Sequence, residues 1–333
     1  MAVARLTEGR HEGGEPRPDG SGRFPASPQN SGGCPMKRTA LRVMVGAGLA
    51  LLLAGVIPLA HAQAPAGMKL YAFSSGGLTV PKNFLQAGAP ATAIQVPVGF
   101  YVVRHRKGNV LFDTGNNDRI ITDPSYWGAF IQGLNPVRTP DVAIDVQLGK
   151  IGLKPDDFKY VVIGHMHLDH GGNVGKFTKS TIVLQKDEIK NAFWGEPGTP
   201  QNYIPGDFMM LRNDPGQLMP NKYPMIQLNG DLDLFADNSV VVKRWVGHTP
   251  GSQMMIVRLP KTGTVILTSD SVYFAENVTK NLLPDVSLAY DPGGIFAAYQ
   301  YIREMQAREG AKFFTAHDPD AWKAMKKAPD FLE

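Results

Sequence analysis

The chain has 333 residues, moderate charge and ordinary hydrophobicity, which suits one large globular domain or two modest ones. Its net charge is +4, but the positive excess lies in residues 1–62, and the rest is nearly neutral. This balance gives no reason to expect nucleic acid or an anionic membrane surface as a partner. The single cysteine, Cys34, precedes the expected mature chain, so the body has no disulfide, thiolate ligand or cysteine nucleophile.

The first 62 residues divide into two segments. Residues 1–35 are rich in Gly, Pro, Ser and charge, which predicts disorder or a non-native extension. Residues 36–62 have the basic start, apolar core and small terminal residues of a secretory signal. An uncleaved membrane anchor is the alternative, but the apolar run is short and contains Gly and Pro, which favours cleavage after Ala62. We therefore expect a mature domain at 63–333, periplasmic or secreted, without stable membrane association.

From Met68 onwards the pattern is rich in expected strands. They cover residues 94–98, 100–104, 109–112, 160–163, 181–185, 240–246, 254–259, 265–268 and 311–315. Helices are expected over 141–153, from Lys186 onwards, and over 295–308. Residues 192–228 carry several Gly and Pro between aromatic and Met residues. We interpret them as an irregular lid or pocket wall for an apolar substrate, the alternative being that they only cover a core edge.

Directly after the strand at 160–163 comes a cluster of metal-binding residue types. His165, His167, Asp169 and His170 lie within six residues and are followed by two glycines. A helix could not place these side chains on one face. A loop leaving the end of a strand can point all four inward, which is how metal sites on rigid scaffolds are built.

Three more candidate ligands, His248, Asp270 and His317, each stand just beyond a β-like run. Strand ends on one edge of a sheet can converge on one place. Seven ligands exceed the needs of one four-coordinate zinc and suit two metals that share a carboxylate. We expect two divalent ions, with zinc the first choice, although cobalt, manganese or iron accept the same ligands.

Two other polar residues are open to interpretation. Asp113 ends the strand at 109–112, where it could orient a metal ligand or simply form a turn. His105 lies beside Arg104 and Arg106, and we expect it at the surface.

The motif His-x-His-x-Asp-His with a later Gly-His-Thr-Pro-Gly, a later Asp and a last His resembles the metallo-β-lactamase superfamily over about residues 68–320. The resemblance implies an α/β fold, a four-layer αββα sandwich with the metals at one edge. Carried over by position, the first metal would be held by His165, His167 and His248, the second by Asp169, His170 and His317, with Asp270 as the bridge.

Within that superfamily the chain is most similar to the N-acyl homoserine lactonases, because a tyrosine, Tyr273, stands three residues after Asp270. The resemblance implies a dinuclear-metal hydrolase that opens lactone rings, with quorum quenching as the role. Tyr273 and Asp169 would be the catalytic side chains, the first as donor to the developing oxyanion and the second as proton shuttle. The partner would be a small ester or lactone with an apolar portion, and the oligomeric state stays open.

Several alternatives remain. A phosphotriesterase or arylesterase would use the same metal motif, and an aromatic cage without room for an acyl chain would favour it. A glutathione thioesterase lacks support, because no C-terminal helical domain follows His317. Oxygen-reducing iron relatives usually carry Glu where His167 stands, and a non-catalytic metal-binding protein would be expected to have lost a ligand. Metal analysis separates these classes.

Overall fold

The computed structural model describes residues 65–195, 202–212 and 223–333, and the strands β1 to β11 within these ranges lie in two sheets. The first sheet has the order β1 (Lys69–Pro81), β2 (Ala93–Arg104), β3 (Asn109–Phe112), β4 (Phe158–Val162), β5 (Thr181–Gln185) and β6 (Met225–Leu228). The second has the order β11 (Lys312–Phe314), β10 (Gly263–Leu267), β9 (Gln253–Leu259), β8 (Val240–Arg244) and β7 (Leu232–Asp233).

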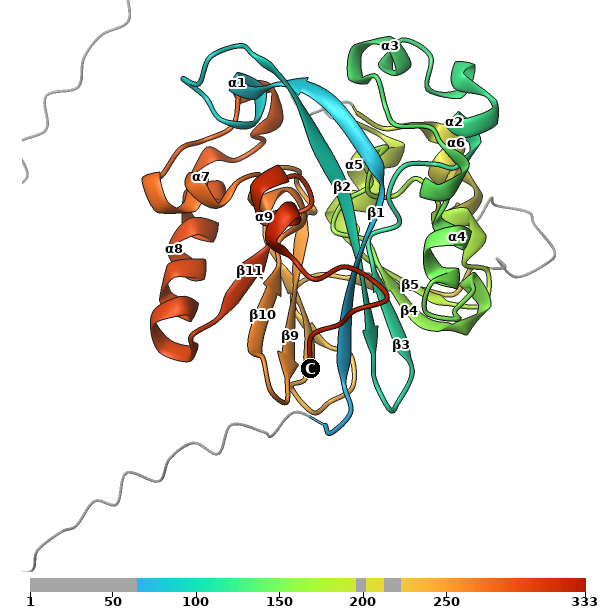
Figure 1. Cartoon of the computed structure of the whole chain (residues 1–333), viewed down its shortest axis with the longest axis vertical. Coiled ribbons are helices and arrows are strands. Elements are labelled where there is room, and N and C mark those ends of the chain that lie inside the picture. Colours follow the sequence, from blue (N-terminus) through green and yellow to red (C-terminus); the bar gives the residue numbers. More distant parts are fainter. Residues whose placement is uncertain (1–64, 196–201, 213–222) are drawn as a thin grey trace, which may run out of the picture. The chain divides into compact units, whose positions relative to one another are not determined.

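The helices, except the last, connect these strands along the chain. They are α1 (Lys82–Leu85), α2 (Arg119–Thr122), α3 (Phe130–Leu134), α4 (Ile144–Gly149), α5 (Lys186–Phe193), α6 (Pro205–Phe208), α7 (Ala275–Lys280), α8 (Pro292–Glu309) and α9 (Pro319–Ala324). Figure 1 shows α7 and α8 on one side of the strands and α2, α4 and α6 on the other. Within the described residues, no helix has the length and apolar character needed to cross a membrane.

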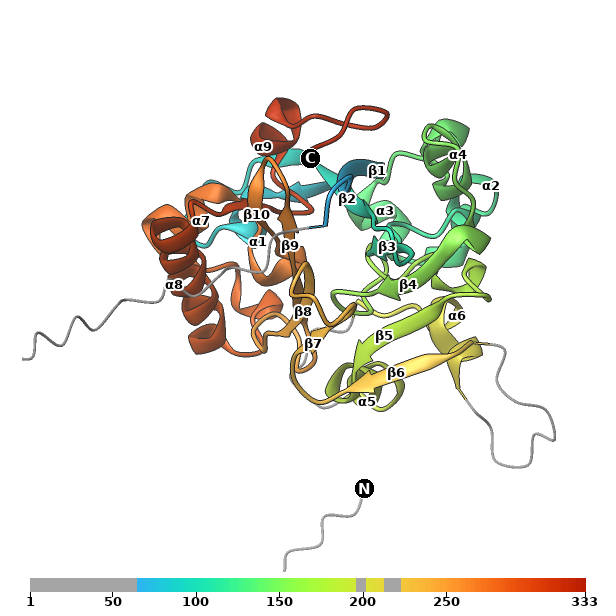
Figure 2. The ribbon, with the colours of Figure 1, turned by 90° about the horizontal axis from the view of Figure 1, so that it is seen from below.

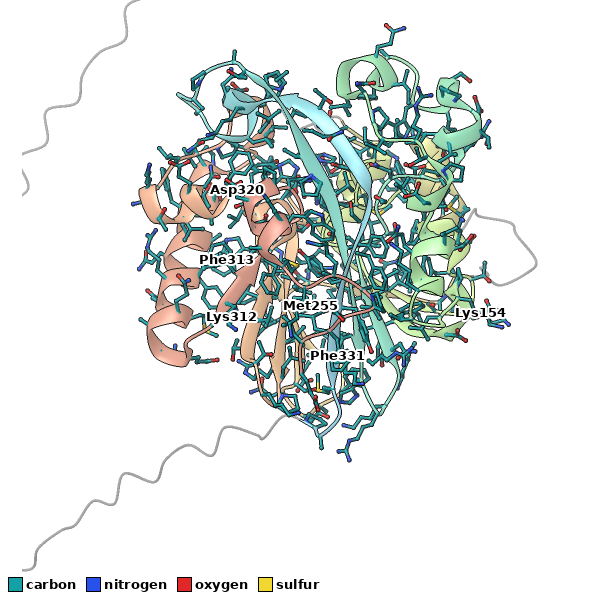
Figure 3. All side chains as sticks on the ribbon, viewed as in Figure 1. Lys154, Met255, Lys312, Phe313, Asp320 and Phe331 are labelled. Atoms are coloured by element: carbon teal, nitrogen blue, oxygen red, sulfur yellow. The ribbon has the colours of Figure 1, made fainter. Side chains whose placement is uncertain are left out.

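Three apolar clusters show that the elements form four layers. One cluster joins residues of β1–β5 to residues of β8–β10 and fills the space between the sheets. A second joins the other face of the first sheet to α4, and a third joins β9 and β10 to α7 and α8. Figure 2 shows the two sheets from below, and Figure 3 shows Met255 of the central cluster among the strands. The predicted αββα sandwich is therefore confirmed.

Sequence pattern explains why the central strands and α8 form. β9 is buried at all but one of its positions, as expected for a strand covered on both faces. In α8 the buried side chains recur at helical spacing, and Gly310 ends the helix in the left-handed conformation that glycine adopts without strain. The buried residues of α8 are Ile295, Ala298, Tyr299, Ile302 and Met305, the stripe predicted to be core.

The strand directions bring the chemistry to one edge. β3, β4, β5 and β6 run parallel in the first sheet, and β10 and β11 run parallel in the second. β8 runs in the same direction as β10, because both are antiparallel to β9. The loops that follow β3, β4, β8, β10 and β11 can therefore meet at the carboxyl ends of their strands.

Some expectations are corrected. The helix expected over 141–153 is shorter, since α4 ends at Gly149. His105 is buried rather than exposed: its ring stacks on Phe235 at a centroid distance of 3.9 Å and faces Asp237. Burial lowers the pKa of His105, and the nearby carboxylate of Asp237 offsets part of this decrease. The predicted extension and signal segment, residues 1–62, lie outside the described residues.

Gln253 ties the two sheets together beneath the histidine-rich loop. Its Nε2 donates to the carbonyl oxygens of Ile163 and Val183, at 2.8 and 3.1 Å, and its backbone N–H donates to Gly164 at 2.9 Å. The side chain is completely buried, so these contacts are shielded from water. Gln253 thus fixes the start of the histidine-rich loop against the second sheet.

We predict that Gln253→Leu lowers the free energy of unfolding by about 1–3 kcal/mol, because a buried carbonyl loses its donor. Urea unfolding followed by circular dichroism measures this change. The control is Gln95→Leu, at an exposed position of β2, which should change stability by less than about 0.5 kcal/mol. Equal stability of the Gln253 variant and wild type would show that the inter-sheet contact is dispensable.

Candidate metal centre

All seven predicted ligands meet at the edge formed by these strand ends. His165, His167, Asp169 and His170 come from the loop after β4, and the other three follow β8, β10 and β11. Their ligand atoms form three overlapping groups that could hold metal ions. Six of the seven side chains are buried, and Asp169 is partly exposed. The structure therefore places together residues that are up to 152 positions apart, from His165 to His317.

Three histidine nitrogens converge on one side of the centre. Nδ1 of His167 lies 3.0 Å from Nε2 of His165 and 2.9 Å from Nε2 of His248. Oδ2 of Asp270 faces the same group, 3.8 Å from His165 Nε2 and 3.5 Å from His248 Nε2. Three nitrogens and one oxygen are the donor set of a four-coordinate zinc site.

The other oxygen of Asp270 faces a second group. Its Oδ1 lies 3.1 Å from Nε2 of His170 and 3.2 Å from Nε2 of His317. Asp169 completes this group, with its carboxylate oxygens 3.8 Å from His170 Nε2 and 3.4 Å from His317 Nε2. Asp270 therefore stands between two donor sets, which is the position of a bridging ligand.

The hydrogen bonds around the second group show that a cation fits it. Nδ1 of His170 lies 2.9 Å from Oδ2 of Asp113, and Nδ1 of His317 lies 2.8 Å from the carbonyl oxygen of Pro97. A proton on each Nδ1 satisfies these acceptors and leaves a lone pair on each Nε2. The two Nε2 atoms are 3.2 Å apart. Two lone pairs at this distance repel each other, and a divalent cation between them would turn that repulsion into coordination.

The charges of the centre also favour a bound cation. Burial opposes ionisation of Asp270, but His170 and His317 outweigh it and hold the pKa of its carboxyl well below the usual value. Burial likewise lowers the pKa of His170, but Asp270, Asp169 and Asp113 outweigh it and raise this pKa well above the usual value. The carboxylates of this buried edge therefore favour positive charge at Nε2 of His170, either as an added proton or, in its place, as a bound divalent cation.

Asp113 lies behind His170 rather than in a plain turn. Its Oδ1 accepts from the backbone N–H of Gly164 at 2.6 Å, and Oδ2 accepts from Ser269 Oγ at 3.0 Å as well as facing His170. Its backbone is left-handed, with φ of 62°, a conformation that Asp tolerates better than most residues. Asp113 thus orients a ligand and joins its loop to the loops at 164 and 269.

Tyr273 contacts one histidine from each of the two donor sets. Its hydroxyl oxygen lies 3.1 Å from Nδ1 of His248, and its ring stacks on His317 with centroids 6.1 Å apart. Burial, with Asp270 and Asp169, raises the pKa of Tyr273 well above its usual value. The hydroxyl therefore keeps its proton at neutral pH and can act as a hydrogen-bond donor.

A pocket of about 460 Å³ opens onto the centre and has a mainly apolar wall. Besides residues of the centre, that wall includes Leu78, Val80, Phe84, Leu85, Val96, Phe130, Leu134, Leu168 and Leu288. Most of it therefore comes from β1, α1, β2 and α3. The pocket is large enough for a small ligand with an apolar chain.

The prediction that residues 192–228 form the pocket wall is wrong for the residues of that range that the structure describes. Among the described residues of that range, Asn202 alone lines the pocket, whereas Phe208 and Leu211 are buried in the core against the first sheet. Residues 196–201 and 213–222 lie outside the described residues. Sequence reasoning missed the true wall because apolar residues of a strand and a short helix look like ordinary core.

The chain belongs to the metallo-beta-lactamase superfamily, whose family model matches residues 95–326. It is similar to the N-acyl homoserine lactonase AttM of Azorhizobium caulinodans, with 32% identity over 80% of this chain and 99% of that protein. It is also 25% identical to the N-acyl homoserine lactonase AiiA of Bacillus thuringiensis subsp. kurstaki, over 79% and 98% of the two chains.

Solved structures agree with this placement. One is an N-acyl homoserine lactone hydrolase with the product N-hexanoyl-L-homoserine bound at its catalytic metal centre, with a TM-score of 0.66 and 25% identity. The match covers 79% of this chain and 98% of that one. The dizinc quorum-quenching lactonase AidC shares the fold, with a TM-score of 0.57 and 18% identity over 81% and 94% of the chains.

Proposed function

We propose that this chain is a dinuclear metal-dependent hydrolase that opens the ring of N-acyl homoserine lactones. The observation that carries the proposal is Asp270, whose two oxygens face separate donor sets beside an apolar pocket. Relatives that align over nearly their whole length are named as enzymes with this activity. Hydrolysis of such signal molecules would make the chain a quorum-quenching enzyme.

We assign His165, His167 and His248 to the first metal, Asp169, His170 and His317 to the second, and Asp270 to both. Zinc is the proposed metal, because it commonly binds histidine nitrogens and carboxylate oxygens with four ligands per ion. Two such ions would lower the pKa of a water they share and polarise a carbonyl oxygen, so that hydroxide is available near neutral pH.

The remaining chemistry belongs to side chains of this chain. When hydroxide adds to the lactone carbonyl carbon, negative charge develops on the carbonyl oxygen, and the protonated Tyr273 hydroxyl donates a hydrogen bond to it. The bond between the carbonyl carbon and the ring oxygen then breaks. Asp169 takes the proton of the newly added hydroxyl group and passes it to the leaving alkoxide, which gives the carboxylate and the free hydroxyl of the open-ring product. Asp169 suits this role because it lines the pocket and is the most exposed residue of the centre.

The pocket favours an acyl chain over an aryl ester or phosphotriester. Its apolar wall is mainly aliphatic, with Leu and Val residues outnumbering Phe84 and Phe130. An aryl substrate would be recognised better by an aromatic cage. The lining thus supports a flexible hydrocarbon chain on the substrate.

The main prediction is that zinc-loaded protein hydrolyses N-hexanoyl homoserine lactone to the open-ring acid. The reason is that the centre would supply both the attacking hydroxide and the groups that stabilise the developing oxyanion. Proton release in a weakly buffered assay, with mass spectrometry of the product, measures it. Asp270→Ala should lose activity by at least about 100-fold and retain less zinc, since both donor sets lose an oxygen. A zinc-loaded wild type without ring opening would reject the substrate, and full activity of the Asp270 variant would reject the bridge.

A second prediction concerns Tyr273. Tyr273→Phe should lower kcat by about 10- to 100-fold with little change in metal content, because one oxyanion donor is removed while the ligands stay. Steady-state kinetics with N-hexanoyl homoserine lactone measures the change. Tyr223→Phe is the matched control, since that hydroxyl donates to the carbonyl oxygen of Gly175 at 2.8 Å, outside the pocket lining. Equal kcat in both variants would remove Tyr273 from the mechanism.

We further propose that the chain is exported and acts in the periplasm or the outside medium. The signal-like composition of residues 36–62 supports this. After expression in a Gram-negative host, N-terminal sequencing of the periplasmic protein should begin at Gln63. Leu52→Arg, which interrupts the apolar core, should leave the protein uncleaved in the cytoplasm. A wild-type protein with an intact N-terminus in the membrane fraction would contradict cleavage.

A further inference from the structure

Glu188 is a completely buried carboxylate that neither belongs to the seven ligands nor lines the pocket. It is the third residue of α5. An acidic residue in the first turn of a helix is commonplace, but one without solvent exposure is costly unless donors surround it. Burial raises the pKa of Glu188, and hydrogen bonds from its neighbours oppose that rise. Those neighbours show what the carboxylate does.

The donors to Glu188 come from the two loops that supply the first metal's ligands. Oε1 accepts from the backbone N–H of Met166 at 2.7 Å, and Oε2 accepts from Thr249 Oγ1 at 2.6 Å. The backbone of Gly251 also donates to this carboxylate. Met166 stands between His165 and His167, and Thr249 directly follows His248. The side chain of Glu188 therefore binds residues adjacent in sequence to all three histidines of that site.

Close packing around Glu188 supports the same role. A Cβ on Gly251 would lie 2.0 Å from the backbone nitrogen of Glu188, so only glycine allows this approach. Tyr203 donates from its hydroxyl to Oε1 of Glu188 at 2.9 Å, and its ring packs edge-on against His167 with centroids 4.6 Å apart. Asn191 in turn donates to the Tyr203 hydroxyl at 2.8 Å. Glu188 thus also fixes the ring that supports His167.

The histidines of the centre are held in two ways. His170 and His317 each have an acceptor directly at Nδ1, namely the carboxylate of Asp113 and the carbonyl oxygen of Pro97. His248 of the first metal site likewise has an acceptor at Nδ1, the carbonyl oxygen of Leu288 at 2.7 Å. His167, by contrast, presents Nδ1 itself to the centre. The backbone beside His167 and the face of its ring are two places where the protein holds this ligand, and Glu188 acts on both, through Met166 and through Tyr203.

We infer that Glu188 is the positioning residue of the first metal site: by joining the loops at Met166 and at Thr249 to Gly251, it sets the affinity of that site without touching metal or substrate. The inference rests on the proposed two-metal centre and not on the identity of the substrate. A carboxylate is needed at this position because both of its oxygens accept hydrogen bonds. The donors, a backbone N–H and two hydroxyl groups, belong to buried or partly buried residues and would lose their acceptor if either oxygen were replaced.

The test is Glu188→Gln, which keeps the shape but replaces one acceptor oxygen by an amide donor. That amide then faces N–H or O–H groups of the two loops and cannot accept from them. We expect a loss of about 10- to 100-fold in affinity at the first site. At a chelator concentration that wild type withstands, zinc measured by elemental analysis should fall from about two ions per chain to about one.

Two control variants separate positioning from general stability. Ile189→Ala removes a partly buried apolar side chain from the same helix and should lower the melting temperature while both metals stay. Asp113→Asn weakens the support of His170 and should cost the second site its metal instead. After cobalt loading, the ion left in the Glu188 variant should therefore have a different visible spectrum from the ion left in the Asp113 variant.

The outcomes are distinct. If Glu188→Gln retains both metals as firmly as Ile189→Ala does, or loses both together, the inference is overturned. If that variant does not fold, Thr249→Val and Tyr203→Phe each remove one donor, and each should lower first-site retention by a smaller factor; unchanged retention in both would overturn the inference equally. A wild type that binds fewer than two metals would instead reject the proposed function.

Discussion

The whole centre depends on one buried carboxylate that faces two ways. Oδ2 of Asp270 lies toward His165 and His248, and Oδ1 lies toward His170 and His317. Such a group is costly to bury unless positive charge stands on both sides of it. The fold meets this requirement by ending strands of both sheets at the same edge, so that the first sheet supplies one part of the ligand set and the second supplies the rest.

The two sheets must stay in register for this to work, and polar contacts between them provide that register. Gln253 of the second sheet donates to the carbonyl oxygens of Ile163 and Val183 in the first. Asp113, after β3, accepts from Ser269, after β10. Burial of apolar surface between sheets stabilises the sandwich but is not directional. Directional bonds at the edge therefore decide where the loops stand relative to one another.

The ligands were predictable from sequence for a clear physical reason, and the pocket was not. His165 to His170 form a dense run of metal-binding side chains directly after a buried strand, a pattern that ordinary packing does not require. Leu78 and Phe84, which line the pocket, carry no such signal, because apolar residues on a strand or short helix are equally typical of core. His105 was misjudged for the opposite reason: its charged neighbours suggested exposure, whereas its ring packs on Phe235.

Glu188 shows a further limit of ligand motifs. A motif records side chains that touch the metal, and Asp113 could be suspected because it ends a strand next to them. Glu188 acts on backbone N–H groups and on hydroxyls, so its partners, such as Met166 and Thr249, have no residue pattern that identifies them. Its sequence context at the start of α5 is that of any acidic first-turn residue. Only complete burial distinguishes it, and burial of a single carboxylate is set by the packing of distant loops, which the local sequence does not reveal.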